Sequence, residues 1–290
     1  MDVHAGTLAV VDEPLHCYRH PDRETRLACS ECGRPICTDC MHHAPVGIRC
    51  PEHANVGAVK PNAARTVRQV RGNITRHAAP VTAALVAINV VVYLITVAQG
   101  PGGMSPGGAL LNKGLLYGVN VGQGEYWRLF TVMFLHGSVL HIAFNMFALW
   151  WLGSIVEQLI GPLRFLLVYL ASGLAGSAGA LLYSGLQTPT VGASGAIFGI
   201  MGALLVLEFM QTGSLAGQAM SMIVINLVIS FSIAGISIGG HLGGLVGGIV
   251  ATFALAKTRY MQPRWIGPAL VVGVGVVSVA IAIAYAKGTI

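Results

Sequence analysis

A serine stands at the head of a long apolar run, where a membrane helix would ordinarily carry a hydrocarbon side chain. Residues 191–202 read VGASGAIFGIMG, and Ser194 carries the only hydroxyl among them. His241 lies at the start of a second apolar run, SIGGHLGGLVGG. A histidine that takes the proton of a serine makes that serine a nucleophile. The alternative is structural, because membrane helices accept serine as a small residue at packing interfaces.

Two further polar residues could stabilise the oxyanion that such a nucleophile creates. His141 and Asn145 are four residues apart in FLHGSVLHIAFN, so a helix presents both on one face. One preorganised donor to an oxyanion is worth about 3–4 kcal/mol. A helix that begins at Ser194 adds a free backbone N–H and the positive end of its dipole. These residue types predict acyl transfer by a Ser–His dyad.

The dyad has no carboxylate at the same expected membrane level. Glu157 and Glu208 fall near the inner ends of the expected helices, where they are expected to cap a helix or face water. Small residues let helix backbones come close. Two stripes of small residues are Gly195, Gly199 and Ala203 on one helix and Gly240, Gly244 and Gly248 on the other. If the stripes face one another, Ser194 and His241 lie within hydrogen-bond reach.

The composition places these helices in a membrane. Of the 290 residues, 54% are hydrophobic, and residues 81–290 hold only seven Lys or Arg and three Asp or Glu. A soluble domain carries roughly 25% charged residues. Runs long enough to cross a bilayer, which takes about 20 helical residues, are expected near 81–98, 131–159, 164–184, 194–212, 217–236, 240–257 and 266–286. The second run exceeds one span, so its start is expected outside the membrane or in a re-entrant loop.

The Lys and Arg residues set the expected orientation. With the N-terminus inside, eight fall on inner segments and three on outer ones, which favours an N-in, C-out topology. Residues 1–15 lack the apolar core of a signal peptide, so the N-terminal region is expected in the cytoplasm, where thiols stay reduced. We expect a multi-pass protein of the cell membrane with Ser194 near the outer face. The arginine cluster at 65–76 is interpreted as a topology signal or as a contact to anionic lipid heads, and nucleic acid is not an expected partner.

All six cysteines lie within residues 16–53 and form pairs, two of them with a histidine. The pairs, each with its members three residues apart, are Cys17 and His20, Cys29 and Cys32, Cys37 and Cys40, and Cys50 and His53. Such pairs bind tetrahedral Zn²⁺ from a tight turn, so eight ligands predict two structural Zn²⁺ ions. A single Cys₄ site is the main alternative, and disulfides fit a reducing compartment poorly. The spare donors His16, His42 and His43 could replace an assigned ligand.

The spacing leaves open which pairs share a metal, although crossed pairing, first with third and second with fourth, is common in such modules. Closed ligand sets leave no open coordination position, so a structural role or a cytoplasmic protein partner is expected rather than catalysis. A module this small is expected to unfold without metal. The predicted organisation is a disordered tail at 1–15, a zinc-binding module at 16–54, a basic linker at 55–80 and a membrane domain at 81–290.

The chain resembles the rhomboid family of intramembrane serine proteases. The matching segments are WR at 127–128, HGSVLHIAFN at 136–145, GASG at 192–195 and GGHLGGLVGG at 239–248, in the order found in the family. The resemblance implies an all-α polytopic membrane protein with a six-helix core, to which a seventh C-terminal helix is added. It also implies Ser194 as the nucleophile, His241 as the base, and His141 and Asn145 as oxyanion stabilisers.

The same resemblance implies supporting roles for four residues. His136 matches a family histidine near a water-retaining loop, and Phe198 matches the aromatic residue that packs on the catalytic histidine, where many relatives carry Tyr. Trp127 and Arg128 match the Trp-Arg pair of the family. The N-terminal module resembles small B-box-like or ribbon-like zinc modules and lies outside the rhomboid core.

Three functions compete for these residues. A protease would cut transmembrane helices at a helix-weak segment, since a hydrogen-bonded helix cannot offer its carbonyl to the serine; by resemblance, the helix near 217–236 would be its lateral gate. A catalytically silent rhomboid-like protein that binds or escorts membrane proteins could dispense with Ser194 or His241, and both are present. A transporter would spread ionisable groups through the membrane, whereas these cluster at one level. A soluble α/β-hydrolase is excluded, because its nucleophile follows a strand, so a protease is expected.

Overall fold

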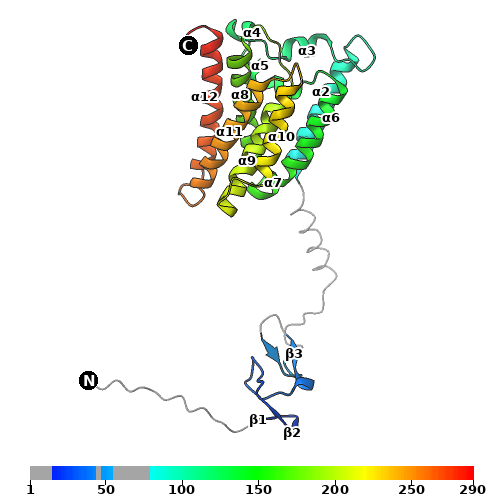
Figure 1. Cartoon of the computed structure of the whole chain (residues 1–290), viewed down its shortest axis with the longest axis vertical. Helices are drawn as coiled ribbons and strands as arrows, with labels where there is room; N and C mark the ends of the chain where they lie inside the picture. The colour runs from blue at the N-terminus through cyan, green and yellow to red at the C-terminus, as the bar shows by residue number, and fades with distance from the viewer. Residues whose placement is uncertain (1–14, 44–46, 55–78) are drawn as a thin grey trace, which may run out of the picture. The chain divides into compact units, whose positions relative to one another are not determined.

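The computed structural model describes residues 15–43, 47–54 and 79–290 (Figure 1). The chain divides into two units, Met1–Gly72 and Asn73–Ile290. Nearly all of the predicted tail at 1–15 and of the predicted linker at 55–80 lies outside the described residues. The arginine cluster in the linker lies outside them too. Their interpretation therefore stays a prediction.

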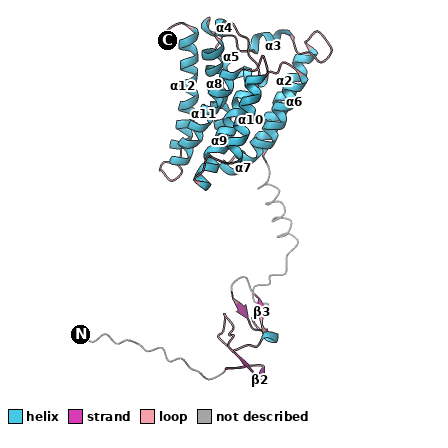
Figure 2. Ribbon diagram, in the orientation of Figure 1, coloured by secondary structure: helices cyan, strands magenta, loops and turns pink. Residues whose placement is uncertain are grey.

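The N-terminal unit contains two small antiparallel ladders and little apolar core. β1 (Leu15–Cys17) pairs with β2 (His20–Thr25), and β3 (His42–His43) pairs with β4 (Ile48–Arg49) (Figure 2). The 3-10 turn η1 (Thr38–Cys40) precedes β3. Among the described residues of this unit, the buried cluster consists of five cysteines and Ile36. So few buried side chains cannot offset the chain entropy lost on folding, so the unit needs a further cross-link.

The second unit is a bundle of helices. Its long helical segments are α2 (Pro80–Ala98), α6 (Val139–Ala148) continuing through the π-helical turn η3 (Leu149–Gly153) into α7 (Ser154–Ile160), α8 (Pro162–Ser184), α9 (Ser194–Thr212), α10 (Gln218–Ser232), α11 (Ile238–Lys257) and α12 (Ile266–Ala286). Within residues 79–290, six helical segments have at least 18 residues and are apolar enough to cross a membrane. The prediction of an all-α polytopic membrane protein is thereby confirmed.

The fifth predicted span is shorter than the sequence indicated. The apolar run at 217–236 forms α10, which has 15 residues and ends at Ser232. At 1.5 Å per residue such a helix is about 22 Å long, short of the roughly 30 Å of a hydrocarbon core. The helix stops because Ile233 is extended, with φ −109° and ψ 118°, and Gly235 follows at φ +86°. Apolar composition continues past the point where the backbone leaves the helix.

The overlong second run divides into separate pieces, as its length predicted. The 3-10 turn η2 (Val132–Phe134) comes first, and the chain then breaks before α6 begins. Ser138 caps α6 by accepting a hydrogen bond from the backbone N–H of His141 at 3.2 Å. Three short helices precede η2, namely α3 (Gly108–Gly114), α4 (Gly118–Gly122) and α5 (Arg128–Thr131). Figure 1 shows them at the end of the bundle where the C-terminus lies.

Glycines bring α11 against α9. A Cβ added at Gly244 would lie 1.9 Å from the carbonyl oxygen of Gly195, and one at Gly248 would lie 2.1 Å from that of Gly199. No side chain fits at such separations, so the two backbones are in direct contact. The predicted facing of the two glycine stripes is confirmed.

The segment GGHLGGLVGG contains three glycine doublets, and the first glycine of each doublet packs against α8 instead. A Cβ at Gly239 would lie 2.3 Å from the carbonyl oxygen of Gly179, and one at Gly243 would lie 2.4 Å from that of Ala175. Because the doublets recur every four residues, the first glycine of the second and third doublets faces α8 and the second glycine faces α9. The repeat therefore wedges α11 between two helices.

Two glutamates cap the N-termini of neighbouring helices in the bundle. Glu157 accepts hydrogen bonds from the backbone N–H groups of Val81 and Thr82, at 2.9 and 2.7 Å, and thus caps α2. Glu208 accepts from the backbone N–H groups of residues 218–219 and caps α10 in the same way. A carboxylate at a helix N-terminus satisfies orphan donors and complements the dipole. The expected capping role of both residues is confirmed.

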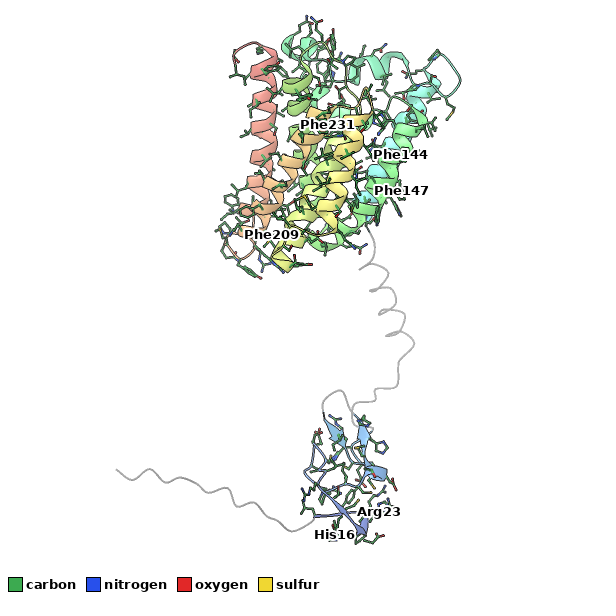
Figure 3. The ribbon with its side chains drawn as sticks, viewed as in Figure 1. His16, Arg23, Phe144, Phe147, Phe209 and Phe231 are labelled. Atoms are coloured by element: carbon green, nitrogen blue, oxygen red, sulfur yellow. The ribbon has the colours of Figure 1, made fainter. Side chains whose placement is uncertain are left out.

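The apolar exterior of the bundle matches a lipid environment. Phe144 and Phe147 of α6 and Phe231 of α10 are labelled in Figure 3, and their exposed fractions are 71%, 65% and 61%. A water-soluble bundle would bury aromatic residues of this size. Exposed aromatic side chains on several helices are therefore expected to contact acyl chains.

Candidate functional site

Ser194 is the first residue of α9, at the end of an anchored loop. Leu116 and Thr190 exchange two backbone hydrogen bonds, at 3.0 and 2.9 Å, and the N–H of Gly192 donates to the carbonyl of Val132 at 3.1 Å. Ser194 is half-buried and lines a cavity of about 20 Å³. The loop thus fixes the hydroxyl at a helix N-terminus, where backbone N–H groups and the helix dipole favour negative charge.

His241 lies in the first turn of α11 and stacks on Phe198. The two ring centroids are 4.1 Å apart and the planes differ by 18°. Ser237 caps this helix by accepting a hydrogen bond from the N–H of Gly240 at 3.2 Å. Phe198 comes four residues after Ser194, so both share one face of α9. The ring on which His241 stacks therefore comes from the residue one helical turn after Ser194.

Within the described residues no hydrogen bond joins Ser194 to His241. The imidazole Nδ1 instead lies 2.7 Å from the hydroxyl oxygen of Ser230 on α10. Catalytic hydrogen bonds are often long or poorly aligned without substrate and tighten in the substrate complex. The structure thus brings the two predicted residues onto touching helices, and it adds Ser230, which the sequence interpretation did not select.

His141 lies against the loop that precedes Ser194. Its Nδ1 accepts a hydrogen bond from the N–H of Gly137 at 3.4 Å, which leaves Nε2 to carry the ring proton. A Cβ added at Gly192 would lie 2.8 Å from this Nε2 and 3.6 Å from the hydroxyl oxygen of Ser194. The absence of a side chain at Gly192 therefore keeps open the space between an N–H donor and the serine.

Asn145 and His136 support His141. The Asn145 Nδ2 donates to the carbonyl of His141 at 2.9 Å, which uses one of its two N–H groups. His136 is fully buried and meets the His141 ring edge-on, with centroids 5.1 Å apart. The predicted oxyanion residues therefore form one cluster with His136.

Trp127 and Arg128 tie the start of α5 to the end of α3. The Trp127 Nε1 donates to the carbonyl of Lys113 at 3.0 Å. The buried Arg128 donates to the carbonyls of Asn112 and Leu115, at 2.9 and 2.8 Å, and its Nε donates to Glu125 at 2.6 Å. The hydrogen bond from Arg128 lowers the pKa of the Glu125 carboxyl. The sequence interpretation missed Glu125, whose three-residue spacing from Arg128 was the available signal.

The N-terminal unit gathers its eight predicted metal ligands into two clusters. One cluster contains Cys17, His20, Cys37 and Cys40, and the other contains Cys29, Cys32, Cys50 and His53. In each cluster, one donor atom from every residue lies within 4.8 Å of the others. The first pair of the sequence thus joins the third, and the second joins the fourth. The clusters do not include His16, His42 or His43.

The separations between donor atoms fit a tetrahedral metal. Tetrahedral Zn²⁺ bound at the usual lengths puts two thiolates about 3.8 Å apart, and a thiolate and an imidazole nitrogen about 3.6 Å apart. The Sγ atoms of Cys32 and Cys50 are 3.9 Å apart, and those of Cys37 and Cys40 each lie 3.4 Å from the Nδ1 of His20. Each cluster could therefore hold one metal ion.

Two thiols in these clusters are already acidic. Burial opposes their ionisation, but backbone hydrogen bonds, from Cys37 and Cys50 respectively, lower the pKa of Cys17 to about 6 and that of Cys29 to about 5. The thiolate is the form that binds metal. The lowered pKa of each thiol therefore favours the form that binds metal.

Comparison with known proteins decides what the membrane unit is. Residues 123–258 match the model of the rhomboid domain. The chain carries a rhomboid domain. This rhomboid domain includes Ser194, His241, His141 and Asn145, and it ends before α12.

Individual rhomboid proteins agree with this result over part of their length. The rhomboid protease GluP of Bacillus subtilis (strain 168) is 40% identical over 139 residues, which are 47% of this chain and 27% of GluP. YdcA of the same strain is 38% identical over 112 residues, 39% of this chain and 56% of YdcA. RHOMBOID-like protein 6, mitochondrial, of Arabidopsis thaliana is 42% identical over 104 residues, which are 35% of this chain and 34% of that protein. The chain thus spans about a quarter to just over half of these rhomboid proteins.

Proposed function

We propose that this protein is an intramembrane serine endopeptidase that cleaves peptide bonds in or near transmembrane segments of other proteins. The observation that carries the proposal is the stack of His241 on Phe198, one helical turn from Ser194, inside a rhomboid domain. This arrangement supports the pairing of a nitrogen base on α11 with a hydroxyl at the N-terminus of α9. Such a pair is what acyl transfer requires.

In the proposed reaction the hydroxyl oxygen of Ser194 attacks the substrate carbonyl while the Nε2 of His241 takes the hydroxyl proton. The negative oxygen that forms receives hydrogen bonds from the Nε2–H of His141, from Asn145 and from backbone N–H groups at the start of α9. The imidazolium then gives its proton to the departing amine. Water, activated by the same histidine, hydrolyses the acyl-enzyme and restores Ser194.

The hydrolytic step needs water inside the bundle. The cavity beside Ser194 also borders the hydroxyl-bearing residues Ser177 and Thr190 and measures about 20 Å³. A polar cavity of about 10–15 Å³ is enough for one water molecule. The cavity therefore has room for the water that the hydrolytic step needs.

The substrate is a membrane helix that unwinds easily. A helical carbonyl is already hydrogen-bonded, so the scissile bond lies in a segment with weak helix propensity. We propose that the site opens to the outer face of the cell membrane, that the N-terminus is cytoplasmic, and that substrates enter past α10. The exposed apolar side chains of α10 are compatible with a helix that borders lipid.

We further propose that the N-terminal unit is a separate structural module at residues 16–54 that binds two Zn²⁺ ions. Cysteine and histidine donors at tetrahedral separations suit Zn²⁺ better than the oxygen-seeking Mg²⁺ or Ca²⁺. All four positions of each cluster are protein ligands, so the metal supplies folding energy rather than catalysis. A cytoplasmic protein is its proposed partner.

The protease proposal is tested by cleavage of a reporter transmembrane segment in liposomes. Wild-type protein should cut the reporter, and Ser194→Ala and His241→Ala should each reduce the rate by at least about 10³-fold. Ser278→Ala is the matched control, because Ser278 only donates to the carbonyl of Val274 on α12. Equal cleavage by wild type and Ser194→Ala would refute the proposal. An inactive wild type that still captures membrane proteins would favour the silent, escorting alternative.

A further inference from the structure

Ser230 is the buried residue in the last turns of α10. Its exposed fraction is 3%, whereas its neighbours Ile229 and Phe231 are 45% and 61% exposed. A hydroxyl that turns inward from an otherwise apolar stretch needs a hydrogen-bond partner. Its partners are the Nδ1 of His241, at 2.7 Å, and the carbonyl of Asn226, at 2.6 Å.

The number of protons available determines which group donates in the hydrogen bonds of Ser230 with Asn226 and with His241. A serine hydroxyl carries one proton, and a carbonyl oxygen can only accept. The hydroxyl of Ser230 therefore donates to Asn226 and presents a lone pair to His241. Nδ1 must then carry the ring proton and donate it to the oxygen of Ser230. The chain of donation runs from His241 through Ser230 to the backbone of α10.

This direction prepares His241 to act as a base. With the proton on Nδ1, the other ring nitrogen, Nε2, has the free lone pair that must accept the proton of Ser194. The opposite tautomer would carry its proton on Nε2 and could not accept another there. Phe198 holds the ring plane by stacking, and Ser230 holds one edge of the ring.

We propose that Ser230 is a positioning residue of the active site, which fixes the tautomer and the orientation of His241. The proposal rests on the proposed protease function. When Nε2 takes the proton of Ser194, the imidazolium keeps its Nδ1–H bond to Ser230, and Ser230 keeps its own proton on the bond to Asn226. No proton moves to Ser230. A neutral hydroxyl from α10 thus does the orienting work that a carboxylate does in soluble serine proteases.

The first test compares Ser230→Ala with Ser230→Thr and with a matched control. Ser232→Ala is that control, because Ser232 is exposed on the same helix and donates only to the carbonyl of Val228, at 2.7 Å. Ser230→Ala should lower the kcat for the reporter at least tenfold, within the about 10²- to 10⁴-fold that a general base supplies, with little change in KM. Ser230→Thr, which keeps a hydroxyl, should recover most of that loss, and Ser232→Ala should match wild type.

The second test removes substrate entry from the measurement. A small fluorophosphonate reacts with an activated serine directly, so its rate of labelling Ser194 reports the dyad itself. Ser230→Ala should slow labelling by the same factor as kcat, at an unchanged thermal midpoint. A variant with kcat and labelling within twofold of wild type would overturn the proposal.

The third test reads the tautomer and does not depend on cleavage. In ¹⁵N-histidine-labelled protein, the His241 signals are identified by their loss in His241→Gln. Wild type should show a protonated Nδ1, and Ser230→Ala should show a mixture of tautomers. A wild-type His241 protonated at Nε2 would overturn the positioning role. If instead the tautomer is as expected but wild type neither cleaves nor labels, the protease function has failed and the hydrogen-bond assignment stands.

Discussion

The imidazole of His241 and the phenyl ring of Phe198 lie face to face, with centroids 4.1 Å apart and planes 18° apart. The first ring comes from α11 and the second from α9. Backbone contact between these helices, through Gly195 and Gly244, makes the stack possible. The position of the proposed base therefore depends on helix packing as much as on the residue itself.

Substitutions of Phe198 should show how far the activity depends on the ring that packs against His241. Phe198→Ala removes a buried ring and should lower stability by about 3–5 kcal/mol and slow cleavage sharply, because His241 loses its stacking surface. Phe198→Tyr keeps the ring and should retain most of the activity. The measurements are the thermal midpoint in detergent and kcat on the reporter. Phe147→Ala, at a lipid-exposed position, is the control and should change neither. A fully active Phe198→Ala would show that the stack is dispensable.

Adding one methyl group to α11 should push it away from α9. Gly244→Ala puts a Cβ where only 1.9 Å separates it from the carbonyl oxygen of Gly195. The resulting helix shift should cost about 1–3 kcal/mol and reduce activity. Gly273→Ala on α12 is the matched control, since a Cβ there meets nothing within 4 Å. Denaturant unfolding in micelles measures the stability of both variants. Equal unfolding midpoints for Gly244→Ala and Gly273→Ala would contradict the contact between α11 and α9.

Loss of a buried cap should loosen α2. Glu157→Ala leaves the N–H groups of Val81 and Thr82 without their acceptor, which costs about 1–3 kcal/mol for each buried group. Glu157→Gln keeps one acceptor oxygen and should lose less. Hydrogen exchange of the amides at the start of α2 is the measurement. Unchanged exchange in Glu157→Ala would show that the cap contributes nothing.

Metal content should report the crossed ligand pairing. We expect the full chain to hold two Zn²⁺. The double variant Cys17→Ser with Cys37→Ser disrupts one cluster and should leave one ion, whereas Cys17→Ser with Cys29→Ser disrupts both and should leave none. Pairing of adjacent ligand pairs along the chain would give the reverse result. His42→Ala is the control and should keep two ions, because His42 belongs to neither cluster. Elemental analysis of the purified protein gives the count.

Much of the membrane fold could be predicted because it depends on local composition. Apolar runs predicted the helices, and the overlong second run predicted a break. The length of α10 could not be predicted, since its apolar composition continues through residues 233–236 while the backbone turns extended at Ile233. Hydropathy reports what lipid tolerates, and it does not report where backbone hydrogen bonds end.

The residue types and spacings of the site were determined by the sequence alone: Ser194, His241, the glycine doublets of α11 and the four Cys or His pairs. Such features are local in the chain, so they can be identified without knowledge of the fold. Only the tertiary structure decided that the ligand pairs cross and that Ser230, rather than a carboxylate, meets the Nδ1 of His241. Both depend on how a turn brings distant side chains together. Many turns are compatible with the same spacing, and packing selects one.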